Sequence, residues 1–297
     1  MTETGRIPTG FIGLGIMGQP MAGHILDGGH PLTVHNRTRA KTAVLAARGA
    51  KVADSPAEVA ARSEIVVTMV TDTPDVEAVV AGPGGILEGI RPGTVVVDMS
   101  TISPETERAL DARLRARGAA LVDAPVSGGD VGARNATLAI MAGGESSAFE
   151  RALPVLRLLG KTITHCGPVG SGQTAKLANQ ILVSVTLLAV SEALVFARKN
   201  GLDPTTLIEA VSGGAAQSWQ LTNLGPRIIK RDFDPGFMID LVQKDLRLIE
   251  EACASAGAAL PATALVHQLF GSAQAHGSGR EGTQALAKVL ERLSGLG

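Results

Sequence analysis

The sequence predicts an α/β chain in which a doubly wound sheet is followed by an all-α C-terminal domain, with a long helix joining the two. Up to about residue 165, short β-branched runs alternate with helical stretches, a pattern typical of a doubly wound sheet. The runs at 65–70 and 94–98 are apolar at successive positions, as in strands that are covered on both faces. After about residue 170 the strand pattern ends, which indicates a change of domain.

The individual elements follow from local patterns along the chain. Strands are expected at 10–13, 32–35, 65–70, 94–98, 120–123, 138–141 and 162–165, and helices between them at 17–28, 38–48, 104–117 and 146–158. Ser103-Pro104 predicts a helix start, because serine caps a first turn and proline is tolerated in it. The segment from Gly172 to Lys199 has no proline and ends at Asn200-Gly201, which predicts one long helix. Further helices are expected at 204–212, 219–230, 237–256, 261–276 and 284–293. We place the domain boundary near Gly167-Pro168, giving domains 1–167 and 168–297.

Composition and charge narrow the class of protein. The chain has 297 residues, 45% of them hydrophobic, so a sizeable core can be buried, and its formal net charge is −1. Such a chain lacks the strongly basic character of a general nucleic-acid binder, so no nucleic-acid partner is expected. Two cysteines and an N-terminus without an apolar segment favour a cytoplasmic location. The longest apolar stretch, 181–196, is interrupted by polar residues, so no membrane span is expected.

A glycine-rich segment follows the first predicted strand. Gly13, Gly15 and Gly18 form the pattern G-x-G-x-x-G between a strand and a helix, the context that a dinucleotide-binding loop requires. The first glycine permits a tight turn, the second lets the backbone approach a pyrophosphate, and the third allows close helix packing. A turn without a ligand is the alternative, but the flanking βα pattern favours a Rossmann-type cofactor site. The expected contacts in this loop are Gly13, Leu14, Gly15, Ile16, Met17 and Gly18.

The end of the second predicted strand bears on the choice of cofactor. An NAD-binding domain usually carries an acidic residue there, which accepts hydrogen bonds from the ribose 2′-hydroxyl. Here Asn36 stands in that place, followed by Arg37 and Thr38. A carboxylate would repel a 2′-phosphate, whereas an arginine can bind it with a planar pair of donors. The alternative is an ordinary solvated helix start; the pattern favours NADP(H), with NAD(H) as the less expected cofactor.

Two segments carry candidate catalytic and substrate-binding groups. Ser127-Gly128-Gly129 follows a predicted strand, and its hydroxyl and unobstructed N–H groups can bind a carboxylate. Lys176 and Asn179 open the long helix and share a face at 3.6 residues per turn. A lysine that is desolvated there would have a lowered pKa and could exchange a proton with a hydroxyl or alkoxide. Taken separately, the first segment could be a simple turn and the second a surface charge.

A third segment, Lys244-Asp245, lies on a later helix and by itself would be interpreted as a surface ion pair. Resemblance connects the three segments. The motifs GLGIMGQPM, NRT, VVDMSTISP, DAPVSGG, GQTAKLANQ and DFDPGF with KDL occur in this order over essentially the whole chain. In these motifs the chain resembles the β-hydroxyacid dehydrogenases, the family of 3-hydroxyisobutyrate dehydrogenase and tartronate semialdehyde reductase.

The resemblance implies roles for individual residues. Lys176 would be the catalytic lysine and Asn179 its partner, with Ser127, Gly128 and Gly129 forming the loop for the substrate carboxylate. The family pattern also implies cofactor contacts from Met69, Val70, Pro74 and Thr101, and Thr101 is expected to contact the substrate as well. Lys244 would lie near the nicotinamide or the substrate, and Asp245 beside it. The expected reaction moves a hydride between NADP(H) and a small β-hydroxy acid or its semialdehyde, with Lys176 transferring the proton.

Several alternatives stay open at the level of sequence. An imine reductase has the same architecture but usually carries another residue at the position of Lys176, and a non-catalytic cofactor-binding module would be expected to lack the lysine. A 6-phosphogluconate dehydrogenase is similar in its first domain, but its helical domain is longer. No metal is expected, because no His, Cys and carboxylate cluster has ligand spacing. A homodimer or homotetramer is implied by resemblance. The substrate, a small carboxylate of the 3-hydroxyisobutyrate, tartronate semialdehyde or 4-hydroxybutyrate type, is not determined by the sequence.

Overall fold

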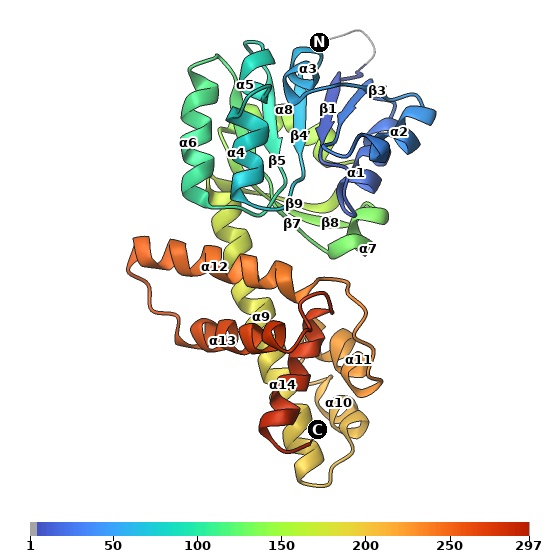
Figure 1. Cartoon of the computed structure of the whole chain (residues 1–297), viewed down its shortest axis with the longest axis vertical. Helices are drawn as coiled ribbons and strands as arrows, with labels where there is room; N and C mark the ends of the chain where they lie inside the picture. The colour runs from blue at the N-terminus through green and yellow to red at the C-terminus, as the bar shows by residue number, and fades with distance from the viewer. Residues whose placement is uncertain (1–4, 297) are drawn as a thin grey trace. The chain divides into compact units, whose positions relative to one another are not determined.

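The computed structural model describes residues 5–296, and the chain divides into two compact units (Figure 1). Unit 1 ends at Lys176 and unit 2 begins at Leu177. This division lies within the long helix α9 (Ser171–Lys199), later than the boundary expected at Gly167-Pro168. The first turn of α9 belongs to unit 1, because the N–H of Gln173 donates a hydrogen bond to Asp123 at the end of a strand of that unit.

Unit 1 is built on one mixed sheet, which follows the order β3-β2-β1-β4-β5-β6-β8-β7, with β9 paired to β8. Its strands are β1 (Thr9–Ile12), β2 (Leu32–His35), β3 (Lys51–Val52), β4 (Ile65–Thr68), β5 (Val95–Asp98), β6 (Ala120–Asp123), β7 (Val126–Ser127), β8 (Leu138–Gly144) and β9 (Gly160–Gly167). The strands from β3 to β6 are parallel, whereas β8 is antiparallel to both β6 and β7. The order 3-2-1-4-5-6 is that of a doubly wound dinucleotide-binding domain, which confirms the predicted fold class.

Helices cover both faces of this sheet. They are α1 (Gly18–Asp27), α2 (Ala43–Ala47), α3 (Pro56–Ala61), α4 (Thr73–Ala81), α5 (Ile86–Gly89), α6 (Pro104–Arg115), α7 (Gly129–Arg134) and α8 (Ser146–Leu156). In β1, Phe11 belongs to the apolar core on one face and Ile12 to the core on the other. Val67 and Val66 of β4 divide between the two cores in the same way. Burial on both faces explains why these strands are apolar at successive positions.

The sequence prediction missed the shortest elements of unit 1. Helices α3, α4, α5 and α7 and strands β3 and β7 were not expected, and β4 ends at Thr68 rather than at residue 70. Most of these elements are only two to six residues long, too short to show a hydrophobic period. Helix α4 is longer, and its start was signalled by Asp72, whose carboxylate accepts from the N–H of Thr73 ahead of Pro74.

Unit 2 consists of helices packed on the remainder of α9. These are α10 (Pro204–Val211), α11 (Gly225–Ile229), α12 (Ile239–Ala256), α13 (Pro261–Ala275) and α14 (Leu286–Leu293), and Figure 1 shows α12 and α13 side by side. Their apolar core includes Leu187 of α9, Leu246 of α12 and Phe270 of α13, all fully buried. The helix expected at 219–230 divides into a π turn at Gln220–Leu224 and α11, because Pro226 cannot donate a helical hydrogen bond.

Helix α9 ends as the sequence predicts. Gly201 has a positive φ of 76°, and the N–H of Leu202 reaches back to the carbonyl of Ala197 at 2.9 Å, which is the glycine-terminated helix end expected at Asn200-Gly201. Among the described residues α9 is also the one helix that is long and apolar enough, by length and composition alone, to cross a membrane. It provides core residues to unit 2, and a buried core helix passes the same test. The expectation from sequence, that the stretch 181–196 does not span a membrane, stays a prediction.

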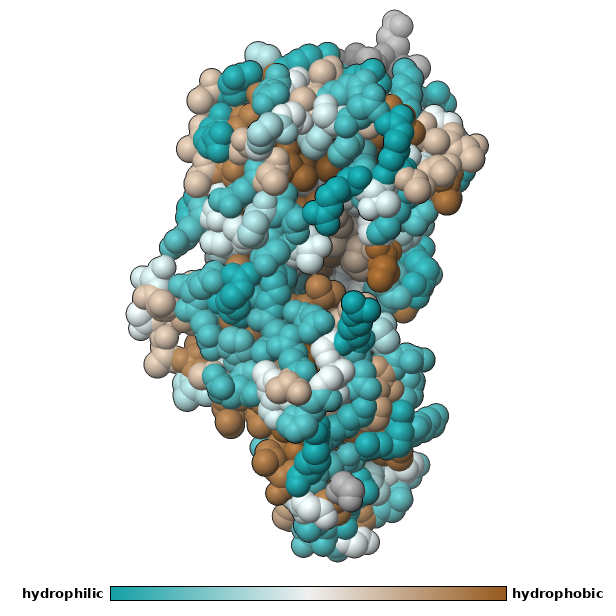
Figure 2. Space-filling view, in the orientation of Figure 1, coloured by the Kyte–Doolittle hydropathy of each residue, from teal (hydrophilic) through white to brown (hydrophobic). Residues whose placement is uncertain are grey.

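The face of the molecule shown in Figure 2 is mainly hydrophilic, with scattered hydrophobic groups. Isolated exposed apolar side chains are normal on a protein surface. The most exposed large ones among the described residues are Leu293, Phe196, Leu182 and Ile16.

Candidate active site

The glycine-rich loop joins β1 to α1 at the carboxyl end of the parallel strands. Gly13 has a φ of 99°, and a Cβ on it would overlap the carbonyl oxygen of Met69, so the turn itself demands glycine. A Cβ on Gly18 would overlap the carbonyl oxygen of Gly13, which is the close helix packing expected of the third glycine. A Cβ on Gly15 would meet nothing within 4 Å. Protein packing therefore explains the first and third glycines but not the second.

Asn36 organises this loop from the end of β2. Its Oδ1 accepts from the N–H of Leu14 at 2.8 Å, and its Nδ2 donates to the carbonyl of Thr38 at 2.9 Å. The side chain of Leu14 is buried in the core, whereas Ile16 and Met17 are partly or largely exposed at the start of α1. Asn36 thus holds the loop in the place where an acidic residue would face a ribose.

Arg37 is the basic group nearest to this point in the sequence, and its side chain is 92% exposed. Its Nη1 lies 3.6 Å from Oδ1 of Asp75 on α4, a distant and solvated contact. Arg39 is differently placed, because it forms an ion pair with Asp54 that lowers the pKa of this carboxyl group. Of the two arginines, Arg37 is the one whose guanidinium is held less closely by a carboxylate.

The other predicted cofactor residues lie along the same edge of the sheet. Met69 and Val70 directly follow β4, Pro74 lies in the first turn of α4, and Thr101 follows β5. The N–H of Met69 donates to the carbonyl of Ile12 at 2.9 Å, which links this segment to the end of β1. The carboxyl ends of neighbouring parallel strands meet at one edge, and ligands of doubly wound sheets bind there. The structure therefore brings these predicted contacts to the edge that carries the glycine loop.

The predicted carboxylate loop follows β6 at this edge. Ser127 is paired with Ala139 in the short antiparallel ladder of β7 and β8. Gly128 and Gly129 have φ angles of 130° and 61°, which side-chain-bearing residues rarely adopt. The chain then enters α7, whose first N–H groups have no intrahelical acceptor. A hydroxyl and backbone donors are thus grouped in one turn, as binding of a carboxylate requires.

His24 connects the two loops. It lies in the last turn of α1, and its Nε2 lies 3.0 Å from each of the carbonyl oxygens of Ala133 and Arg134 at the end of α7. The helix that follows the glycine loop is therefore attached to the helix that follows the Ser127 loop.

Lys176 lies near the start of α9 and is only 8% exposed, unlike the surface lysine that was the alternative from sequence. The preceding turn is attached to Asp123, the last residue of β6. Asp123 accepts from the N–H of Gly170 and from the N–H of Gln173, both at 2.8 Å. Burial raises the pKa of Asp123 to about 6, against the opposing effect of these two donors. At neutral pH an ionised carboxylate thus caps the positive end of the helix that carries Lys176.

The raised pKa of Asp123 links folding to pH, and Asp123→Asn tests this linkage. As the pH rises, the unfolded chain loses its proton first, so wild-type stability falls between about pH 4 and pH 6, by up to about 3 kcal/mol from this group. Asparagine does not titrate, so the variant should become progressively more stable relative to wild type across this window. Urea unfolding of both proteins, followed by circular dichroism, measures the difference.

Asp203 provides a control, because its pKa is lowered whereas that of Asp123 is raised. The backbone N–H of Thr206 lowers the pKa of its carboxyl group, so Asp203→Asn should lose stability relative to wild type as the pH rises. A stability difference for Asp123→Asn that does not change with pH would contradict the raised pKa.

Three buried carboxyl groups in this region had no role predicted from the sequence. Asp98 and Asp123 are register partners at the ends of β5 and β6, and Glu107 lies in α6; all three are fully buried. Gln173 of α9 donates through Nε2 to Glu107 at 2.8 Å and to the carbonyl of Ser100 at 2.9 Å. A signal was present in the sequence, since both apolar strands end in aspartate, but nothing local indicates that Glu107 and Gln173 join them.

The remaining predicted residues belong to unit 2. Asn179 Nδ2 donates to Gln180 Oε1 at 2.9 Å, and Gln180 Nε2 donates to Asp245 Oδ2 at 2.5 Å. Lys244 Nζ lies 2.8 Å from the other oxygen of Asp245, and both side chains are largely buried. The pair is therefore not the solvated surface salt bridge that was the alternative from sequence. Gln180, which the sequence analysis did not single out, connects it to α9.

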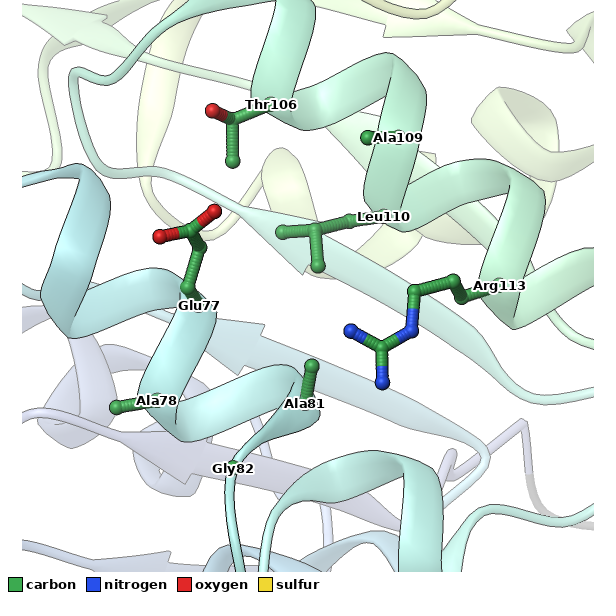
Figure 3. Close-up of a pocket in the computed structure, with 8 residues that line it drawn as sticks. All are labelled: Glu77, Ala78, Ala81, Gly82, Thr106, Ala109, Leu110 and Arg113. Carbon is green, nitrogen blue, oxygen red and sulfur yellow. The ribbon is translucent and has the colours of Figure 1, made fainter.

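A separate hollow of about 370 Å³ lies between α4 and α6 and shares no residue with the predicted site (Figure 3). It is lined by Glu77, Ala78, Ala81, Gly82, Thr106, Ala109, Leu110 and Arg113. In the part of the chain that the structure describes, no group of three or more His, Cys, Asp or Glu side chains is arranged to hold a metal ion.

Known proteins match this chain over nearly its whole length. Residues 8–167 match the NAD binding domain of 6-phosphogluconate dehydrogenase, and residues 170–290 match the family described as NAD-binding of NADP-dependent 3-hydroxyisobutyrate dehydrogenase. The 2-hydroxy-3-oxopropionate reductase of Escherichia coli is 44% identical over 286 residues, which cover 96% of this chain and 97% of that protein. A structure of Mycobacterium tuberculosis 3-hydroxyisobutyrate dehydrogenase with L-serine has 33% identity and a TM-score of 0.90, covering 96% of this chain and 99% of that one.

Fold, glycine loop and these matches together define an NAD(P)-dependent dehydrogenase of small hydroxy acids. The chain belongs to the β-hydroxyacid dehydrogenase family, as its motifs predicted. An imine reductase from Streptomyces aurantiacus is 23% identical with a TM-score of 0.64, covering 95% of this chain and 99% of that one. At this identity the likeness shows a shared fold alone.

Proposed function

We propose that the protein reduces a small semialdehyde acid with NADPH, and in reverse oxidises the corresponding β-hydroxy acid, with Lys176 transferring the proton. The observation that carries the proposal is the burial of Lys176 within the unit that also contains the glycine loop and Ser127–Gly129. The chain is 44% identical to a 2-hydroxy-3-oxopropionate reductase, so tartronate semialdehyde is the first substrate to test. A homodimer or homotetramer and a cytoplasmic location stay predictions.

Each residue of the proposed site has one task. When bound, NADP(H) supplies the hydride in reduction and accepts it in oxidation. The Ser127 hydroxyl and the N–H groups of Gly128 and Gly129 bind the substrate carboxylate and so fix the position of the carbonyl group. Lys176 Nζ donates a proton to the carbonyl oxygen in reduction and removes it from the hydroxyl in oxidation. Asn179, three residues further along α9, orients the lysine or bonds to the substrate oxygen.

The preference for NADP(H) rests on the end of β2. Asn36 carries no charge there, and the exposed Arg37 can form paired hydrogen bonds with a 2′-phosphate. The family description for residues 170–290, which specifies an NADP-dependent dehydrogenase, supports this preference.

Initial rates across a panel of semialdehyde acids and β-hydroxy acids, with NADPH and NADH side by side, test the proposal. We expect kcat/KM to be at least about 10-fold higher with NADPH, a difference of about 1.4 kcal/mol, and tartronate semialdehyde to be reduced. Arg37→Ala should reduce this preference by raising KM for NADPH alone. In the control variant Arg39→Ala the effect should be smaller, because Arg39 is paired with Asp54. Equal rates with both cofactors would reject the preference, and no turnover across the panel would reject the substrate class.

A further inference from the structure

Three carboxyl groups are buried together beside the start of α9. Asp98 and Asp123 end adjacent strands, and Glu107 lies in the first turn of α6, each with no exposed surface. The groups that face them are mostly neutral: hydroxyls of Thr68 and Ser100, the amide of Gln173 and backbone N–H groups. The negative charge of Asp98 raises the pKa of both Glu107 and Asp123, so the three carboxyl groups affect one another. Burying three carboxylates in this way would be very unfavourable, which indicates that a proton is bound.

Hydrogen bonding indicates where that proton lies. Asp98 Oδ1 accepts from Thr68 Oγ1 at 2.5 Å and from Ser100 Oγ at 2.7 Å, so donors stabilise a charge on Asp98. Glu107 Oε1 accepts from Gln173 Nε2 at 2.8 Å. The second oxygens, Asp98 Oδ2 and Glu107 Oε2, are both buried and have no hydrogen-bond partner among the described residues, and each carboxyl group affects the pKa of the other, which indicates that the two groups are neighbours. Two carboxylates have no hydrogen to donate, so both oxygens would stay unsatisfied, whereas a proton on one of them supplies the missing hydrogen bond.

We propose that Glu107 is protonated at neutral pH and donates a hydrogen bond to Asp98. This acid pair acts through Gln173 to position the turn of α9 that precedes Lys176. Burial and the negative charges of Asp98 and Asp123 both raise the pKa of Glu107, in agreement with the geometry.

Gln173 is the element through which the pair acts. Its Nε2 donates to Glu107 and to the carbonyl of Ser100, its Oε1 accepts from the N–H of Ile102 at 3.2 Å, and its own N–H donates to Asp123. Its side chain is fully buried. Lys176 follows three residues later, about one helical turn. If Glu107 were ionised, repulsion from Asp98 would separate the two groups and displace the acceptor of Gln173. The effect on turnover rests on the proposed role of Lys176, whereas the protonation does not.

Amide variants test the shared proton. In Glu107→Gln, the amide group donates to Asp98 while its oxygen still accepts from Gln173. In Asp98→Asn, the amide group can donate to Glu107, while its oxygen keeps Thr68 and Ser100. Each single variant therefore retains one donor and one acceptor, but the double variant turns two NH₂ groups toward each other. We expect each single variant to keep kcat within about threefold of wild type and the double variant to lose about tenfold or more, a strongly non-additive result.

Comparison of kcat with the Kd for NADPH distinguishes a positioning role from a general loss of structure. In the double variant kcat should fall by a larger factor than the affinity for NADPH, because the glycine loop lies on other elements and only Val70 and Thr101 among the predicted cofactor contacts adjoin this network. Additive losses, or an equal loss of cofactor affinity, would overturn the proposal.

Isotope-edited infrared spectroscopy of the intact protein gives an answer that does not depend on catalysis or on the double variant folding. Wild type at neutral pH should show the carbonyl band of a protonated carboxyl group, which disappears in Glu107→Gln. The matched control Asp111→Asn should keep the band, since Asp111 is paired with Arg115 at 2.6 Å. Absence of the band in wild type would refute the shared proton, even if Lys176 proves to be essential. Loss of the Lys176 role alone would leave the band unchanged.

Discussion

Lys176→Ala is expected to lower kcat by about 10²- to 10⁴-fold, the range that a positioned general acid or base contributes. The side chain is 8% exposed, and the helix start that carries it is held by hydrogen bonds from the N–H groups of Gly170 and Gln173 to Asp123. The Kd for NADPH should change by less than about threefold, because the glycine loop proposed to bind the pyrophosphate lies elsewhere in the unit. Stopped-flow rates and cofactor titration by fluorescence measure the two quantities separately.

Two further variants make this result specific. Lys176→Arg keeps the positive charge, but a guanidinium does not release its proton, so activity should stay low. Lys199→Ala removes an exposed lysine from the last turn of the same helix and should leave kcat unchanged. If Lys176→Ala retained wild-type turnover, the proposed proton transfer would be wrong. If it lost cofactor affinity in proportion to kcat, the lysine would have a structural rather than a catalytic role.

Gly15→Ala is expected to separate cofactor binding from folding. A Cβ at this position meets nothing within 4 Å, so the free energy of unfolding should stay within about 0.5 kcal/mol of wild type. The added methyl group would occupy the approach to the N-terminus of α1, where backbone N–H groups bind a pyrophosphate. The Kd for NADPH and for NADH should therefore rise by about tenfold or more, or about 1.4 kcal/mol, and by similar factors because both cofactors contain a pyrophosphate.

The neighbouring glycines and a remote one provide the comparison. Gly18→Ala should destabilise the fold itself, since its Cβ would overlap the carbonyl of Gly13. Gly213→Ala also adds a methyl group in open space, but in unit 2, and should change neither stability nor cofactor affinity. Unaltered binding of both cofactors by Gly15→Ala would show that the loop does not hold the pyrophosphate there.

Secondary structure could be predicted from the sequence wherever neighbouring residues gave a strong pattern. The apolar runs at 65–70 and 94–98 predicted strands buried on both faces, and Phe11 and Ile12 illustrate that burial in β1. The proline-free segment before Asn200-Gly201 predicted α9 to within one residue at its start. Elements as short as α5 or β7 gave no such signal, because a few residues do not complete a hydrophobic period.

The sequence by itself determined the fold class, the glycine loop, the motifs of the family and the candidate lysine, because each can be recognised from short continuous segments of the chain. Only the tertiary structure decided that Lys176 is buried, that Gly15 faces open space, and that Asp98, Glu107 and Gln173 meet. These last contacts join residues that are far apart in the chain. They exist because parallel strands end at a common edge, where the register of β5 and β6 and the packing of α6 and α9 bring the side chains together.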